Sequence, residues 1–225
     1  MAERLGRTGM SVVVNYLSDA AAAAQVVTAI ENGGGRAVAV RADVADPAQI
    51  RRLFDAAAHH FGGADIVVGN AGTARFTPLV EATDDDFDLM FTGSAKSTFT
   101  LLREAAARLP DGGRIVVISS GVTRTHRPGS GLYGATKAAG EQLVRVLARE
   151  LAPRGITVNS VLPGAVRTEA LAASGITGQL DRIAESIPLG RVGEPDDIAD
   201  IVAFLASHDA RWITGAAVPA GGGAF

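Results

Sequence analysis

Residues 114–120 have the sequence RIVVISS, an apolar run that ends in two serines. A short continuous run of β-branched residues is typical of a strand buried on both faces, as in a parallel sheet. We therefore expect Ser120 at the carboxyl edge of that strand, the edge where open α/β sheets bind their ligands. A hydroxyl at this edge can hold a carbonyl or alcohol oxygen of a substrate.

The sequence YGATK follows, from Tyr133 to Lys137. Side chains four residues apart share one face of a helix. A phenol titrates near pH ~10 in water, and a neighbouring ammonium group favours the phenolate and so lowers this pKa. We therefore expect Lys137 to bring Tyr133 closer to a working acid or base at neutral pH. The alternative for this pair alone is structural, a partly buried tyrosine beside a surface lysine.

Strands and helices alternate along the rest of the chain. Asp19 and Thr83 are suited to cap helices, and Pro47 and Pro195 are suited to first helical turns. The predicted strands are 11–15, 36–40, 66–69, 114–119, 157–162 and 216–218, and the predicted helices are 20–30, 47–60, 84–108, 132–151 and 195–206. This alternation predicts an α/β fold, with one parallel sheet and helices on both faces. We expect residues 169–187, which are weakly patterned, to form a mobile helical lid.

The composition is that of a globular protein, with 225 residues of which 47% are hydrophobic and 20% are charged. This length suits one large α/β domain. The formal net charge of −3 gives no indication of a nucleic-acid partner, and the absence of cysteine excludes disulfides. No run approaches the ~18 apolar residues that span a membrane, and the first residues lack a signal-peptide core. We therefore expect a cytoplasmic protein with no membrane partner.

A metal site is not expected. The four histidines show no metal-ligand spacing. Three consecutive aspartates, residues 84–86, are better explained as negative charge at a helix N-terminus than as metal ligands.

Together, Ser120, Tyr133 and Lys137 resemble the catalytic core of the short-chain dehydrogenase/reductase family. Residues 12–16 (VVVNY) and 191–195 (RVGEP) resemble its 3-oxoacyl-[acyl-carrier-protein] reductase-like branch. The resemblance implies a Rossmann-like doubly wound sheet and hydride transfer between a nicotinamide cofactor and a carbonyl or alcohol substrate. The resemblance implies that Ser120 and Tyr133 bind the substrate oxygen and that Tyr133 is the general acid/base. It also implies that Lys137, besides lowering the pKa of Tyr133, binds the cofactor ribose. Members of this branch pair their long helices, which implies a homodimer or homotetramer.

Two stretches after predicted strands resemble the family's adenosine-binding loops. Residues 69–72 (GNAG) resemble its Asn-Asn-Ala-Gly motif, which places Asn70, Ala71 and Gly72 near the adenosine and ribose. A plain tight turn is the alternative. The resemblance also implies that Asp43, followed by Val44, accepts a hydrogen bond from the adenine amine. A turn or a helix cap is the alternative there.

Residues 163–168 (PGAVRT) resemble the family's Pro-Gly loop, which binds the nicotinamide end of the cofactor. Pro163 and Gly164 correspond to its first two residues. By that resemblance, the backbone at Val166 and the hydroxyl of Thr168 hold the nicotinamide carboxamide. Asn15 ends the predicted strand 11–15, where NAD enzymes place an acid for the ribose 2′-hydroxyl. Because Asn15 has no charge to repel a 2′-phosphate, we expect NADP, with NAD as the alternative.

The start of the chain departs from the family pattern. Family members begin with a strand and a glycine-rich turn that cradles the pyrophosphate, and both are missing here. That strand is central in the sheet, so strands 11–15 and 66–69 would each keep an unpaired edge. Each buried unpaired backbone group costs about 1–3 kcal/mol. We hypothesise that the working protein begins roughly twenty residues upstream, the length of one strand and one turn.

Ser94 is the second departure. The resemblance places it where the family has an asparagine that holds a water in a proton relay from the lysine. A hydroxyl can hold a water but lacks the paired groups of the amide, so we expect a slower relay. The two departures leave a rival function open, that of a family relative that binds or scaffolds without catalysis.

Overall fold

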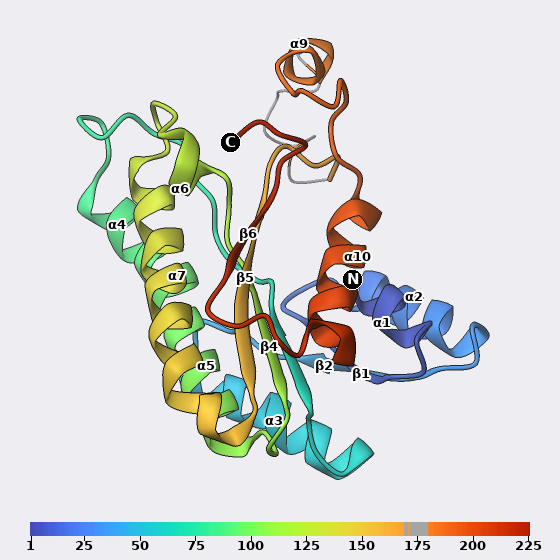
Figure 1. Cartoon of the computed structure of the whole chain (residues 1–225). Helices are drawn as coiled ribbons and strands as arrows, with labels where there is room; N and C mark the ends of the chain where they lie inside the picture. The colour runs from blue at the N-terminus through green and yellow to red at the C-terminus, as the bar shows by residue number, and fades with distance from the viewer. Residues whose placement is uncertain (169–170, 172–179) are drawn as a thin grey trace.

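The computed structural model describes residues 1–168, 171 and 180–225. Parallel strands are flanked by helices on both faces, as Figure 1 shows, so the predicted α/β fold class is confirmed. Of the expected lid, residues 169–187, residues 169–170 and 172–179 lie outside the described residues, and its last part contains α9 (Leu180–Glu185). None of the described helices combines the length and the hydropathy that crossing a membrane requires.

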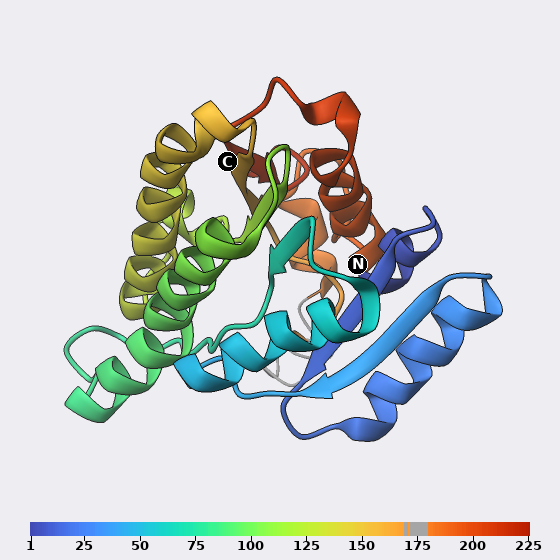
Figure 2. The ribbon, with the colours of Figure 1, turned by 90° about the horizontal axis from the view of Figure 1, so that it is seen from below.

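The strands form two separate parallel sheets. β1 (Ser11–Tyr16) pairs with β2 (Arg36–Arg41) in the smaller one. The larger sheet has the order β3 (Ile66–Gly69), β4 (Arg114–Ile118), β5 (Thr157–Pro163) and β6 (Ala217–Ala220). Figure 2 shows β1 and β2 set apart from the larger sheet, and no ladder joins β1 to β3 among the described residues. The prediction that β1 and β3 each have an unpaired edge is therefore confirmed.

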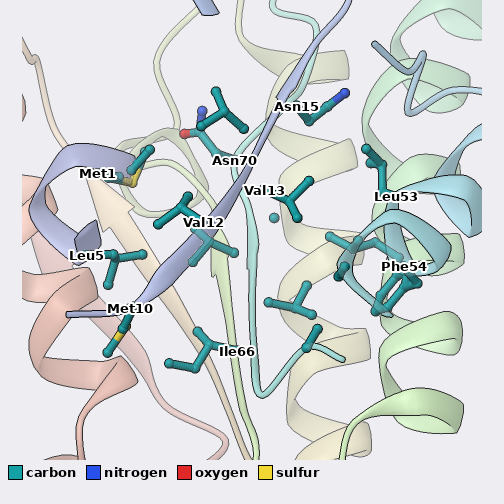
Figure 3. Close-up of a pocket in the computed structure, with 18 of the residues that line it drawn as sticks. Met1, Leu5, Met10, Val12, Val13, Asn15, Leu53, Phe54, Ile66 and Asn70 are labelled. Atoms are coloured by element: carbon teal, nitrogen blue, oxygen red, sulfur yellow. The ribbon is translucent and has the colours of Figure 1, made fainter. Parts of the chain in front are cut away.

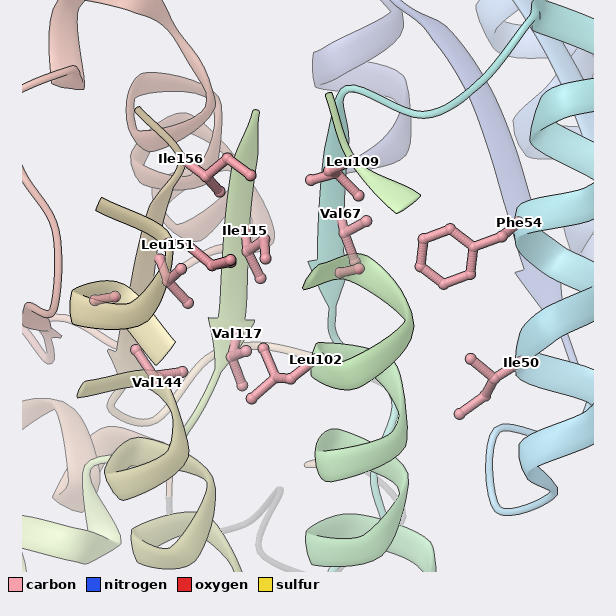
Figure 4. Packing of buried hydrophobic residues seen from close by; sticks show 13 residues of the cluster. Ile50, Phe54, Val67, Leu102, Leu109, Ile115, Val117, Val144, Leu151 and Ile156 are labelled. Carbon is pink, nitrogen blue, oxygen red and sulfur yellow. The ribbon is translucent and has the colours of Figure 1, made fainter. Parts of the chain in front are cut away.

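Helices cover both faces of the sheets. One layer consists of α3 (Pro47–Phe61), α5 (Ser97–Arg108) and α7 (Gly131–Leu151), and the opposite layer of α1 (Ala2–Gly6), α2 (Ala20–Asn32) and α10 (Pro195–Ala206). The main hydrophobic core lies between the first layer and the strands, as Figure 4 shows, and includes Phe54, Leu102, Ile115 and Val144. Three shorter helices lie outside these two layers: α6 (Val122–Thr125), η2 (Ala152–Arg154) and η4 (His208–Ala210).

Helix starts follow the predicted caps. The Asp19 carboxylate accepts a hydrogen bond of 2.8 Å from the Ala22 amide at the start of α2. Thr83 and Asp86 form a capping box at the start of α4 (Asp84–Met90). Asp86 also forms an ion pair with Arg75. The aspartates at this helix start therefore stabilise the helix, as predicted.

A π-helix, η1 (Phe91–Lys96), separates α4 from α5. The prediction of a helical pattern from 84 to 108 is confirmed, with a widened turn over these six residues that the sequence did not reveal. Widened turns of this kind occur frequently at functional sites, and η1 carries Ser94. Ser94 is 2% exposed, so the altered turn holds its hydroxyl inside the protein.

A cavity of about 760 Å³ lies between β1 and β3. Every residue from Ser11 to Asn15 and from Ile66 to Gly69 lines it. Successive side chains of a strand point to opposite faces, so a cavity that meets every residue must run along the edges of the two strands. Figure 3 shows Met1, Asn15 and Asn70 at one end of this cavity, and Met10 and Ile66 at the other. The space therefore follows the two unpaired edges.

Candidate active site

Ser120 and Tyr133 come together at the carboxyl edge of the larger sheet. Ser120 follows the end of β4, and its neighbour Ser119 is tied to β5 by an amide hydrogen bond of 2.8 Å to the Val161 carbonyl. Tyr133 lies in the first turn of α7. The Ser120 side chain faces the Tyr133 hydroxyl closely enough to favour the ionised form of this phenol. The predicted pairing of these two side chains is therefore present in the structure.

Burial raises the pKa of Tyr133 above its ordinary value, and the hydrogen bond with Ser120 offsets part of this rise. Lys137 does not reverse that direction. Its ammonium nitrogen lies 5.8 Å from the centre of the tyrosine ring and donates a hydrogen bond of 2.9 Å to the Ile118 carbonyl. The pKa of Tyr133 is thus raised in this structure, where we expected it to be lowered, because burial of the phenol is the largest influence on it.

Lys137 is itself enclosed by the protein. Burial lowers the pKa of its ammonium group from 10.5 to about 8, because the charged form loses contact with water. A Cβ atom added at Gly72 would lie 3.2 Å from Lys137 Nζ and 3.3 Å from Ser94 Oγ. Gly72, Ser94 and Lys137 therefore meet at one point, although they come from a loop, a π-helix and α7.

The Ser94 hydroxyl holds the loop that follows Gly72. Its oxygen accepts a hydrogen bond of 3.1 Å from the Thr73 amide, and the hydroxyl donates one of 3.1 Å to the Thr73 carbonyl. A hydroxyl has one hydrogen and two lone pairs, so one lone pair remains for a further partner. Ser94 therefore lies beside Lys137 as the predicted alignment requires, and it has a structural partner that the sequence did not reveal.

The predicted nicotinamide loop runs from the end of β5 beside Ser120. The Gly121 amide donates a hydrogen bond of 2.8 Å to the Pro163 carbonyl. A Cβ atom at Gly164 would come within 2.9 Å of the Gly221 Cα atom, so this close approach of two backbones requires glycine. Val166 forms a bridge with Gly193, and the Thr168 hydroxyl accepts a hydrogen bond of 3.2 Å from the Leu171 amide.

Residues predicted for the adenosine end lie around the ends of β1, β2 and β3. The Asp43 carboxylate accepts a hydrogen bond of 2.8 Å from the Ala45 amide. Asp43 therefore stabilises a turn, which is the alternative role given for it above. The Asn15 amide group donates a hydrogen bond of 2.9 Å to the Ala42 carbonyl. Val44 packs against the main core, while Asn70 and Ala71 line the cavity between β1 and β3.

Two neighbours of the Ser120–Tyr133 pair were missed in the sequence. The Phe76 ring packs edge-on against the Tyr133 ring with 5.5 Å between centroids, and it is half exposed. No spacing signal marks a loop aromatic of this kind. Glu141 is buried behind Ser119. Its position four residues after Lys137 and eight after Tyr133, on the same helix face, is a signal that could have identified it.

Comparisons with known proteins agree over nearly the whole chain. A family model described as Enoyl-(Acyl carrier protein) reductase matches residues 1–224. An uncharacterised oxidoreductase of Methylorubrum extorquens is 44% identical over 226 residues, which are 99% of this chain and 91% of that protein.

Two crystal structures of one C-6 ketoreductase, LanV, are also similar. An angucycline C-6 ketoreductase with bound NADP has a TM-score of 0.93 and 41% identity, over 99% of this chain and 89% of that one. A landomycin C-6 ketoreductase with bound NADP and rabelomycin has a TM-score of 0.89 and 41% identity, over the same shares of the two chains.

Proposed function

The chain belongs to the short-chain dehydrogenase/reductase family, and from this premise we propose that it reduces a ketone or aldehyde to an alcohol with NADPH. Hydride transfer between a nicotinamide cofactor and a carbonyl or alcohol substrate is the chemistry of this oxidoreductase family. The observation that carries the proposal is that the Ser120 and Tyr133 side chains meet at the carboxyl edge of the sheet, with Lys137 one helical turn from Tyr133.

The residues at this edge suit the nicotinamide end of a dinucleotide. Gly72 has no side chain, and a Cβ atom there would crowd Lys137 and Ser94. Lys137 has three N–H donors and uses one of them on the Ile118 carbonyl. We assign to Lys137 the ribose hydroxyls, and to Val166 and Thr168 the carboxamide. When bound, the nicotinamide supplies or accepts the hydride.

The protein's own residues hold the substrate oxygen and move a proton. The hydroxyls of Ser120 and Tyr133 donate hydrogen bonds to the carbonyl oxygen and stabilise the negative charge that develops there. Because its pKa is raised, Tyr133 is a neutral phenol at neutral pH and is ready to act as an acid. It gives its proton to the alkoxide oxygen, and the Lys137 ammonium stabilises the resulting phenolate.

Asn70, Ala71, Gly72, Asp43 and Val44 are the residues that we assign to the adenosine end. The second oxygen of the Asp43 carboxylate is the proposed acceptor for the adenine amine, because its first oxygen holds the Ala45 amide. We propose NADP rather than NAD for two reasons. Asn15 carries no negative charge at the end of β1, and the similar ketoreductase LanV was crystallised with NADP in two structures.

Ser94 is proposed as the residue that holds a relay water beside Lys137. The substitution Ser94→Asn should raise kcat a few-fold, because an amide offers both a donor and an acceptor to that water. Steady-state rates at saturating substrate test this, with Ser97→Asn in the next turn as a control. A folded Ser94→Asn variant with unchanged kcat would count against a relay at this position.

The substrate is proposed to present an apolar ring next to its carbonyl group. Phe76 offers a half-exposed aromatic face beside Tyr133, which suits such a ring. The similar landomycin C-6 ketoreductase was crystallised with rabelomycin.

For the assembly we propose a cytoplasmic homodimer or homotetramer, since α5 and α7 expose Phe99 and Val146. Size-exclusion chromatography with light scattering measures this state.

Absorbance assays of NADPH oxidation test the function with 3-oxoacyl thioesters, small ketones and polycyclic aromatic ketones. We expect reduction of at least one class, with a higher kcat/KM for ketones that carry an aromatic ring. Fluorescence titration with NADPH and NADH tests the cofactor preference separately. Binding of NADPH without reduction of any substrate would favour the rival function, a relative that binds the cofactor without catalysis.

A further inference from the structure

The buried carboxylate of Glu141 connects α7 to the segment that carries Ser120. Glu141 is 4% exposed. Its Oε1 atom accepts hydrogen bonds of 2.6 Å from the Ser119 hydroxyl and 2.8 Å from the Thr123 hydroxyl. These two residues flank Ser120 along the chain. One carboxylate oxygen therefore holds both sides of the turn in which Ser120 lies.

The same carboxylate also faces two cations. Its Oε2 atom lies 3.8 Å from a guanidinium nitrogen of Arg124, in α6, and 3.9 Å from one of Arg145, one turn further along α7. The Thr123 hydroxyl is also within 3.0 Å of the Ser120 carbonyl. A hydroxyl has one hydrogen, and a carboxylate is a stronger acceptor than a carbonyl, so Glu141 is its preferred partner.

We propose that Glu141 is a positioning residue, which holds the Ser120 hydroxyl in place against the Tyr133 hydroxyl through Ser119 and Thr123. Tyr133, Lys137 and Glu141 follow one another at intervals of four residues on one face of α7. The helix that carries the proton donor thereby also fixes its partner. On the opposite side, backbone hydrogen bonds from Ser119 and Gly121 to β5 hold the same turn.

This inference rests on the proposed function, and the experiment separates the two. Reduction by the wild-type protein is measured first. The variant Glu141→Leu removes both acceptors at similar size, and Glu150→Leu makes the same change at an exposed position of α7. We expect kcat to fall about ten- to hundredfold in Glu141→Leu, the scale of a small misplacement of reacting groups, while the Kd for NADPH stays within about twofold. Glu150→Leu should match the wild type.

A double-mutant cycle identifies the route of the effect. If Glu141 acts through Ser120, Glu141→Leu should have no further effect on kcat in a Ser120→Ala background. Additive losses in the cycle would overturn the proposal, as would an unchanged kcat in a folded Glu141→Leu protein. Glu141→Asp should recover part of the rate, because it restores the carboxylate. Full loss in Glu141→Asp would also contradict the proposal.

Two further measurements keep the proposal testable. If Glu141→Leu does not fold, Thr123→Val removes one of the two donors at equal size, and kcat should fall several-fold. If the wild-type protein reduces no substrate, the proposed function fails. Hydrogen exchange then tests whether Glu141 holds the Ser120 turn in place. Exchange of the amides in residues 119–125 should be faster in Glu141→Leu than in Glu150→Leu. Equal exchange rates there, or an unchanged kcat in Thr123→Val, would refute the positioning role.

Discussion

Tyr133 is the side chain through which the proposed proton transfer passes. The substitution Tyr133→Phe keeps the ring and its contact with Phe76 but removes the acidic hydroxyl. General acid catalysis contributes typically 10²–10⁴-fold, so we expect kcat to fall by at least about a hundredfold while circular dichroism stays unchanged. The control is Tyr16→Phe in β1, the other tyrosine of the chain. An unaffected rate in Tyr133→Phe would end the assignment of Tyr133 as the acid.

Lys137 makes stability depend on pH in a specific window. Its pKa is about 8 in the folded protein and 10.5 in a freely solvated lysine, so between these values the unfolded chain holds a proton that the folded chain has released. Stability rises with pH wherever the unfolded state binds more protons. The free energy of unfolding of the wild type should therefore rise, relative to Lys137→Met, from about pH 8 to pH 10.5.

Urea denaturation at several pH values measures this difference. Lys96→Met, which removes an exposed lysine, is the matched control. Curves for wild type and Lys137→Met that stay parallel through the window would show that burial does not lower the pKa of Lys137.

At the scale of single elements, α7 has more stability to gain. Gly140 lies inside this helix, and a Cβ atom there would be 3.5 Å from the nearest atom, Thr98 Cγ2, an ordinary contact. Glycine inside a helix destabilises by roughly 0.5–1 kcal/mol relative to alanine. Gly140→Ala should therefore raise the free energy of unfolding by about this amount in urea denaturation.

A glycine at the end of the same region provides the contrast. Gly155 ends η2 with φ of 65°, a conformation that is strained for alanine, so Gly155→Ala should lower stability. Loss of stability in Gly140→Ala would mean that α7 and α5 are packed too tightly for one more methyl group.

At the scale of the whole molecule, the break between the two sheets leaves strand edges unpaired and so lowers the stability of the fold. The unpaired edges of β1 and β3 border a cavity of about 760 Å³. Met1 lies at the end of this cavity where both strands finish, near Asn15 and Asn70 in Figure 3. A strand joined ahead of Met1 by a short turn would therefore run parallel to both neighbours and complete one continuous sheet.

Adding such a segment tests whether the unpaired edges of β1 and β3 limit stability and cofactor binding. A strand of β-branched residues followed by a glycine-rich turn, placed before Met1, should raise the Tm and tighten NADPH binding. The added backbone pairs both edges, and the turn supplies amides for the pyrophosphate. Thermal denaturation and fluorescence titration measure the two effects. A segment of equal length with proline at alternate positions cannot pair. An equal gain with that segment would show that pairing of the two edges is not the cause of the gain.

Local sequence signals predicted much of this protein. The strands, the caps at Asp19 and Thr83 and the helical spacing of Tyr133 and Lys137 follow from interactions within a few residues along the chain. The family resemblance added the expectation that no strand pairs between β1 and β3, and the structure shows their unpaired edges.

Only the tertiary structure decided what surrounds the site. It revealed the buried Glu141 carboxylate that binds the Ser119 hydroxyl and the hydrogen bonds of Ser94 to the Thr73 backbone. It also showed that the pKa of Tyr133 is raised rather than lowered. Each of these depends on contacts between distant parts of the chain or on loss of water around a buried group. The helical spacing of Tyr133, Lys137 and Glu141 marks the face of α7 on which Glu141 lies, but not its partners, because packing sets which side chains meet and how far each is removed from solvent.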